Sequence, residues 1–87
     1  MKRVIILTAV WCPACIVVKN TIKKIQKEYV LFKPEYIDID EEEALAQHYE
    51  PLKVLPIFIL LDENDQVIKR LSGELSKETI MKEFMYV

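Results

Sequence analysis

The stretch that decides the fold is Val4–Val10 (VIILTAV), which runs directly into Trp11–Cys15 (WCPAC). The first part is rich in β-branched residues and almost wholly apolar, which is typical of a strand buried on both faces of a sheet. We therefore expect Val4–Val10 to form a central strand. The second part contains the only two cysteines of the 87-residue chain, separated by two residues.

An amphipathic pattern begins directly after the second cysteine. Apolar residues recur at three- and four-residue spacing while charged residues fill the other side, which predicts a helix with one face on the sheet. The expected inner face consists of Ile16, Val18, Ile22, Ile25 and Tyr29. The expected outer face consists of Lys19, Lys23, Lys24, Lys27 and Glu28.

The position of the cysteines suggests their chemistry. Cys12 falls where strand becomes helix, and Pro13 occupies the first helical position, where a missing N–H costs nothing. The unpaired N–H groups and the positive end of the helix dipole favour a thiolate, so Cys12 is the expected nucleophile. Cys15, one helical turn on, can attack a mixed disulfide between Cys12 and a substrate and release the reduced product. A Cys12–Cys15 disulfide would be the redox group, with no other cofactor.

The middle of the chain predicts a second strand and a second helix. Tyr36–Asp40 alternates in the manner of a short strand. Asp40 is expected to cap a helix whose first turn is Glu41–Glu43, with Glu43 reaching back in a capping box. The helix is expected to have a modest inner face and to stop at a proline; these residues are Ala44, Leu45, Tyr49 and Pro51.

The C-terminal part predicts a hairpin and a last helix. Ile57–Leu61 and Gln66–Leu71 flank Asp62–Asp65, which is typical of two antiparallel strands joined by a turn. Gly73, the sole glycine, lies in the following bend. Ser76 is expected to cap a helix whose packing residues are Ile80, Met81 and Phe84.

This order of elements predicts a parallel pair of strands joined to an antiparallel pair, with helices on both sheet faces. The expected fold is an α/β sandwich of three layers, with a four-stranded mixed sheet and about three helices. A chain of 87 residues must bury almost every apolar segment. We therefore expect a single domain spanning 1–87, and nothing in the sequence requires more than a monomer.

Composition argues against several classes of partner. The net charge is −2 with acids and bases interspersed, so neither nucleic acid nor a membrane surface is expected as a partner. Met1–Arg3 precedes an apolar run as in a secretion signal, but the run is short, no small-residue cleavage site follows, and cleavage would remove the central strand. We expect a cytoplasmic protein.

A Cys-X-X-Cys pair can also be half of a zinc site. Four ligands are normally needed, and His48 is the only other conventional partner, so no metal is expected. Redox use is the favoured interpretation of the cysteine pair. His48 itself is expected to be a solvated helix residue.

Taken together, these motifs resemble those of small thioredoxin-fold proteins along nearly the whole chain. Trp11–Cys15 matches the active-site pattern of that family, Leu55–Ile57 matches its cis-proline segment, and Gly73–Lys77 followed by Phe84 is similar to its C-terminal part. The resemblance implies a cis Leu55–Pro56 bond facing the cysteines. It also implies substrate contacts with Trp11, Pro13, Ala14, Leu55 and Pro56.

The activity implied by the resemblance is that of a thiol–disulfide oxidoreductase that reduces protein disulfides. A thioredoxin-reductase-like donor or glutathione would return it to the dithiol form. Two alternatives stay open: a glutaredoxin-like reductase dependent on glutathione, and a non-catalytic accessory subunit with the same fold.

The chain also departs from the family pattern. Thioredoxins usually carry a buried acid where this chain has Ile6, so that aid to proton transfer is absent. The proline directly after Cys12 and the short length are more similar to glutaredoxins. The glycine pair and the acid with which glutaredoxins hold glutathione are nevertheless not evident near Gly73.

Overall fold

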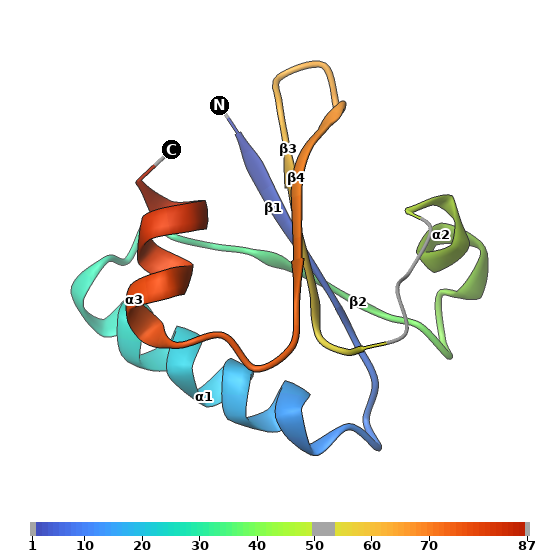
Figure 1. The fold of residues 1–87 in the computed structure, drawn as a ribbon, viewed down its shortest axis with the longest axis horizontal. Coiled ribbons are helices and arrows are strands. Elements are labelled where there is room, and N and C mark those ends of the chain that lie inside the picture. The colour runs from blue at the N-terminus through green and yellow to red at the C-terminus, as the bar shows by residue number, and fades with distance from the viewer. Residues whose placement is uncertain (1, 50–53, 87) are drawn as a thin grey trace.

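Strand β1 (Arg3–Thr8) is an inner strand of a four-stranded mixed sheet with the order β2-β1-β3-β4 (Figure 1). It pairs parallel with β2 (Glu35–Asp38) and antiparallel with β3 (Ile57–Leu61), and β4 (Val67–Ser72) pairs antiparallel with β3. The structure, a computed structural model, describes residues 2–49 and 54–86. The strand order and the pairings confirm the predicted four-stranded mixed sheet. The strand ends at Thr8, so Ala9 and Val10 belong to the connection that follows it.

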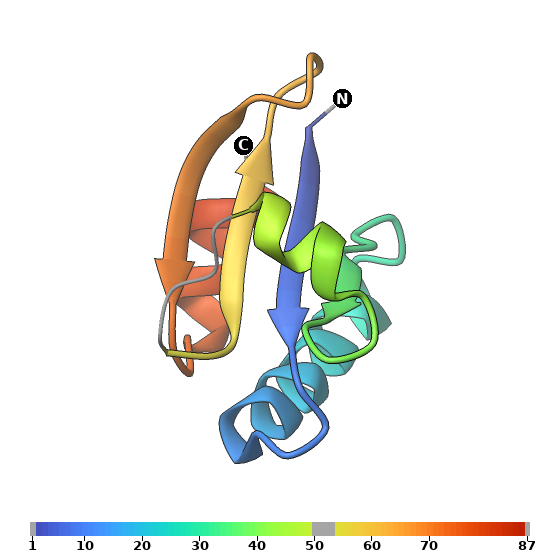
Figure 2. The same ribbon diagram turned by 90° about the vertical axis from the view of Figure 1, so that its right-hand side faces the viewer.

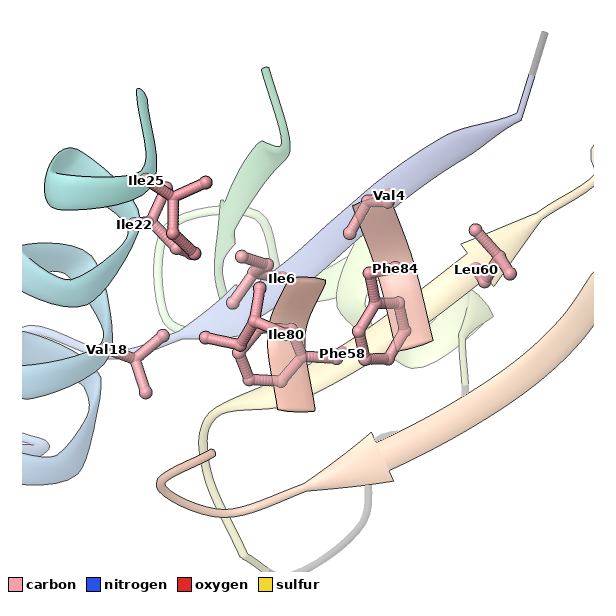
Figure 3. Close-up of a cluster of buried hydrophobic side chains, with 9 residues drawn as sticks. All are labelled: Val4, Ile6, Val18, Ile22, Ile25, Phe58, Leu60, Ile80 and Phe84. Carbon is pink, nitrogen blue, oxygen red and sulfur yellow. The ribbon is translucent and has the colours of Figure 1, made fainter. Parts of the chain in front are cut away.

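Alternating side chains of β1 enter two separate cores, because successive residues of a strand point to opposite faces. Val4 and Ile6 belong to one buried cluster, and Ile5 and Leu7 belong to the other. Figure 3 shows the first cluster, which consists of Val4, Ile6, Val18, Ile22, Ile25, Phe58, Leu60, Ile80 and Phe84. The second contains Ile5, Leu7, Ile37, Ala46, Ile57, Ile59 and Leu61.

Helices cover both faces, as Figure 2 shows. Helix α1 (Pro13–Glu28) and helix α3 (Lys77–Ile80) lie on one face, and α3 continues into the π-helical turn η1 (Met81–Met85). Helix α2 (Glu43–His48) lies on the other face. This is the expected three-layer α/β sandwich. None of the helices within residues 2–49 and 54–86 combines the length and the apolar character needed to cross a membrane.

The inner face of α1 differs from the prediction at its two ends. Cys15, Val18, Ile22 and Ile25 are buried, whereas Ile16 is 56% exposed and Tyr29 is 39% exposed. Neighbouring helix positions are about 100° apart, so placing Cys15 against the sheet turns Ile16 toward solvent. Tyr29 is the residue that ends the helix.

The start of α2 also differs from the prediction. The helix begins at Glu43 after Glu42, which makes no side-chain cap, so Asp40 is not its cap. The carboxylate of Asp38 instead accepts hydrogen bonds from the backbone N–H groups of Asp40 and Glu41, at 2.8 and 3.2 Å. These bonds form a turn after β2, so the helix begins later than predicted, at Glu43. The buried residue of α2 is Ala46, while Ala44 and Leu45 are exposed, Tyr49 packs against the second cluster, and Pro51 lies outside the described residues.

The C-terminal predictions are confirmed. The Ser76 hydroxyl accepts the backbone N–H of Thr79 at 3.2 Å, as a helix cap does. Ile80 and Phe84 are buried, Met81 packs against the first cluster, and the ring of Phe84 stacks on that of Phe58 with centroids 5.2 Å apart. Gly73 has φ +96, a left-handed conformation that favours glycine.

Replacement of Ile22 by alanine tests the packing between α1 and the sheet. The side chain is fully buried, so Ile22→Ala should lower the free energy of unfolding by about 2–5 kcal/mol. Urea titration of the reduced protein measures this loss. The exposed neighbour provides a control, because Lys23→Ala should change stability by less than about 0.5 kcal/mol. Equal effects of the two substitutions would contradict the described packing.

Candidate functional site

The first residue of the site, Cys12, directly precedes α1 as its N-cap. Its backbone is extended, its N–H donates to the Ala9 carbonyl at 3.2 Å, and Pro13 begins the helix. The backbone N–H of Cys15 donates to Cys12 Sγ at 3.2 Å. The sulfur thus occupies the position that a serine or aspartate oxygen takes in an ordinary cap. A negative charge on this sulfur is stabilised by the N–H group and by the helix dipole.

The second thiol, Cys15, lies deeper. Cys12 is 6% exposed and Cys15 is 1% exposed, and both are free thiols. Burial, assisted by the hydrogen bond with Cys12, raises the pKa of Cys15 to about 11. The Cys15 thiol is therefore protonated at neutral pH. The two sulfurs therefore differ in depth, with Cys12 nearer the surface than Cys15.

The surroundings of the pair are rich in apolar contacts. Ala9, Ala14, Ile39 and Leu55 pack against the two cysteines. Ile6, at the position where thioredoxins usually carry an acid, is fully buried in the first core cluster. That position therefore supplies a packing contact and no proton acceptor.

The loop before β3 reaches the cysteines. The Leu55–Pro56 peptide bond is cis, as the resemblance implied, and Leu55 packs against the cysteine cluster. The carbonyl of Pro56 accepts the backbone N–H of Gly73 at 2.9 Å, which ties this loop to the bend after β4. Leu55 is half-buried and the Pro56 ring is buried.

Trp11, beside Cys12, is hydrogen-bonded to Asp40, which the local pattern predicts to be a helix cap. Its indole N–H donates to Asp40 Oδ2 at 2.7 Å, while 63% of the side chain stays exposed. Asp40 therefore orients the tryptophan. A separation of 29 residues gives no local pattern from which this pair could be inferred.

Other predicted site residues are placed as follows. Pro13 is exposed at the start of α1, and Ala14 is half-buried against the cysteines. The apolar residues Val10 and Ile16, which border the motif on either side, are 78% and 56% exposed. They are therefore exposed apolar residues next to the motif, although the local pattern predicts Val10 in a buried strand and Ile16 on the inner face of the helix. Their position next to the motif is the signal that could have identified them.

No metal site accompanies the cysteines in the part of the chain that the structure describes. Within residues 2–49 and 54–86, no three His, Cys, Asp or Glu side chains gather so as to hold a metal ion. His48 is exposed at the end of α2, and its ring lies edge-on to Tyr49 with centroids 5.0 Å apart.

This arrangement defines a class: a thioredoxin-fold protein with a Cys-X-X-Cys pair at the start of the first helix and a cis-proline loop beside it. The sequence model described as Thioredoxin matches residues 1–85. The chain belongs to the thioredoxin family.

Individual relatives agree with this assignment. Thioredoxin H5 of Arabidopsis thaliana is 33% identical over 82 residues, which cover 88% of this chain and 65% of that protein. The solved structure of thioredoxin-2 of a malaria parasite superposes with a TM-score of 0.84 and 27% identity, over 100% of this chain and 84% of the other. Mitochondrial thioredoxin 3 of Saccharomyces cerevisiae, in its oxidised form, shares the fold with a TM-score of 0.80 and 24% identity, over 99% and 78% of the two chains. The present chain thus spans about two thirds of the plant relative.

The raised pKa of Cys15 leads to a test of pH dependence. In a Cys12→Ser variant, alkylation of Cys15 by iodoacetamide should be slow at neutral pH and should rise with a midpoint well above the ordinary value. Burial, the largest cause of the raised pKa, remains when the contributions of Cys12 are removed. Mass spectrometry of quenched samples measures the rate. The same variant unfolded in urea, whose thiol is solvated, should show the ordinary midpoint of about 8.5. A midpoint at or below 9 in the folded variant would contradict the burial of Cys15.

The bond between Trp11 and Asp40 leads to a second test. Asp40→Ala should release the indole, shift its N–H proton resonance and increase quenching of its fluorescence by acrylamide, since the 2.7 Å bond is lost. Glu42→Ala is the matched control, because Glu42 makes no side-chain cap and lies only two residues away. An indole resonance that stays in place in the Asp40 variant would show that the bond is not formed.

Proposed function

We propose that the protein is a thiol–disulfide oxidoreductase that reduces protein disulfides with Cys12 and Cys15. The observation that carries this proposal is the 3.2 Å hydrogen bond from the Cys15 backbone N–H to Cys12 Sγ at the start of α1. It supports Cys12, the more exposed of the two sulfurs, as the attacking group.

The first step is attack of the Cys12 thiolate on one sulfur of a substrate disulfide. The substrate S–S bond breaks, a new S–S bond joins Cys12 to the substrate, and the second substrate sulfur leaves as a thiolate that takes up a proton. The exposed indole of Trp11 and the cis bond before Pro56 would border the incoming polypeptide. Pro13, Ala14 and Leu55 would complete this substrate surface.

The second step is attack of Cys15 on Cys12 Sγ. Cys15 loses its proton to water or to the departing substrate sulfur, the Cys12–Cys15 bond forms, and the bond between Cys12 and the substrate breaks. The substrate sulfur that was bound to Cys12 leaves as a thiolate and takes up a proton. The charge of Cys12 contributes to the raised pKa of Cys15, so the mixed disulfide, which removes that charge, lowers the pKa when the proton must leave. The substrate gains two electrons and the protein loses two.

A donor must then return two electrons to the Cys12–Cys15 disulfide. We propose a thioredoxin-reductase-like donor, because residues 1–85 match the model of the thioredoxin family. Pro13 directly after Cys12 supports glutathione as the second candidate. Turnover with NADPH and thioredoxin reductase, compared with turnover with glutathione and its reductase, separates the two donors.

Substitution of each cysteine tests the proposed reaction. Cys12→Ser should lower the reduction of insulin disulfides to the rate of dithiothreitol alone, since the attacking sulfur is gone. Cys15→Ser should still attack but should accumulate a mixed disulfide with a disulfide-containing peptide, which intact-protein mass spectrometry detects as added mass on Cys12.

Each variant lacks one of the two sulfurs and keeps the other, so each is the control for the other. A Cys12→Ser protein that reduces insulin as fast as the wild type would refute the proposed nucleophile. Complex formation with a partner protein that is unaffected by replacement of both cysteines would instead favour the accessory-subunit alternative.

A further inference from the structure

A second site lies at the other end of α1 from the cysteines. A groove of about 730 Å³ opens between the start of β1, the connection after α1, and the end of the C-terminal helix. Cys12 caps the first turn of α1 and Tyr29 ends the last, so a helix of 16 residues, about 24 Å long, separates the two sites. Lys2 and Tyr86, the first and last residues that the structure describes, both line this groove. A ligand bound in the groove would therefore not cover Cys12.

The groove has an apolar floor and apolar walls. Val4 and Phe84, which line it, are core residues exposed by only 8% and 3%, and Figure 3 shows them close together and away from Val18. Tyr29 and Tyr86 also line it and meet edge to face with ring centroids 6.5 Å apart. Leu31, 86% exposed, extends the apolar wall into solvent. Such a lining and this volume are typical of a site for a small apolar ligand.

Some charged residues at the rim of the groove form ion pairs and others do not. Arg3 is neutralised by Glu35 at 2.8 Å and by Asp65 at 2.7 Å, and Glu28 faces Lys77 at 3.8 Å. Lys2 and Lys33 are exposed and also line the groove, and neither forms an ion pair with any residue of 2–49 or 54–86. The rim therefore carries two lysines with no carboxylate partner in the described part of the chain, and these rim residues with their ion-pair partners have a net positive charge above an apolar floor.

We propose that this groove binds a small amphipathic carboxylate, with its apolar body over Val4 and Phe84 and its carboxylate at Lys2 and Lys33. The apolar floor selects the body of the ligand and the two lysines select its charge. A cationic ligand of the same length would meet the same floor but would be repelled at the rim. The proposal does not depend on the thiol chemistry and is tested independently of it.

Binding of decanoate to the reduced protein, followed in amide NMR spectra, tests the proposal. The resonances of Val4, 29–33 and 84–86 should shift with a saturable dependence on concentration, while those of Trp11 and Cys12 should not. Shortening the probe to octanoate and hexanoate should weaken binding by up to about fourfold for each methylene removed. Decyltrimethylammonium, with the same chain and the opposite charge, should bind more weakly than decanoate.

Two double variants supply matched controls. Lys2→Gln combined with Lys33→Gln should weaken decanoate binding by about threefold or more, the effect of two exposed charge contacts. Lys23→Gln combined with Lys24→Gln removes the same charge from the outer side of α1 and should leave the affinity unchanged. Equal effects of the two double variants, equal binding of the cationic probe, or shifts confined to the surface around Trp11 would each overturn the proposal.

Discussion

Burial of β1 on both faces is the constraint on which the rest of the structure depends. Ile5 and Leu7 fill one core while Val4 and Ile6 fill the other, so the strand can neither slip by one residue nor continue into the exposed Val10. The chain must leave the sheet after Thr8, and Cys12 then falls directly before α1. The geometry of the site thus follows from packing: the Cys12 sulfur accepts the backbone N–H of Cys15, and the Cys15 sulfur, one turn later, is buried.

Segments with a strong local pattern could be predicted from the sequence. The apolar run around Ile6, the hairpin flanking Asp62–Asp65 and the cap at Ser76 each depend on neighbouring residues, and the structure confirms all three. In the hairpin, the Asp62 carboxylate accepts the backbone N–H groups of Asn64 and Gln66, so the turn is stabilised within its own few residues. The cis bond before Pro56 could be expected only from the resemblance, because a single X–Pro pair is seldom cis.

Features set by distant contacts could not be predicted in the same way. Asp40 satisfies the local rule for a helix cap, but its carboxylate bonds the Trp11 indole instead, 29 residues away in the sequence. Ile16 satisfies the apolar spacing of α1, yet the burial of Cys15 fixes a rotation of the helix that leaves Ile16 exposed. In both cases a tertiary contact overrides a valid local preference, and both cases lie at the site. The surface around Cys12 is therefore more apolar than the sequence analysis expected.

The central proposal is that the start of α1 makes Cys12 the reactive thiol, and its reactivity at neutral pH tests this most directly. In a Cys15→Ser protein, where Cys12 is the only thiol, the rate of alkylation by iodoacetamide at pH 7 is compared between the folded protein and the same protein in urea. Hydrogen bonding to the sulfur and the helix dipole exist only in the folded state, so the account predicts faster alkylation there. Slower alkylation of the folded protein would contradict it.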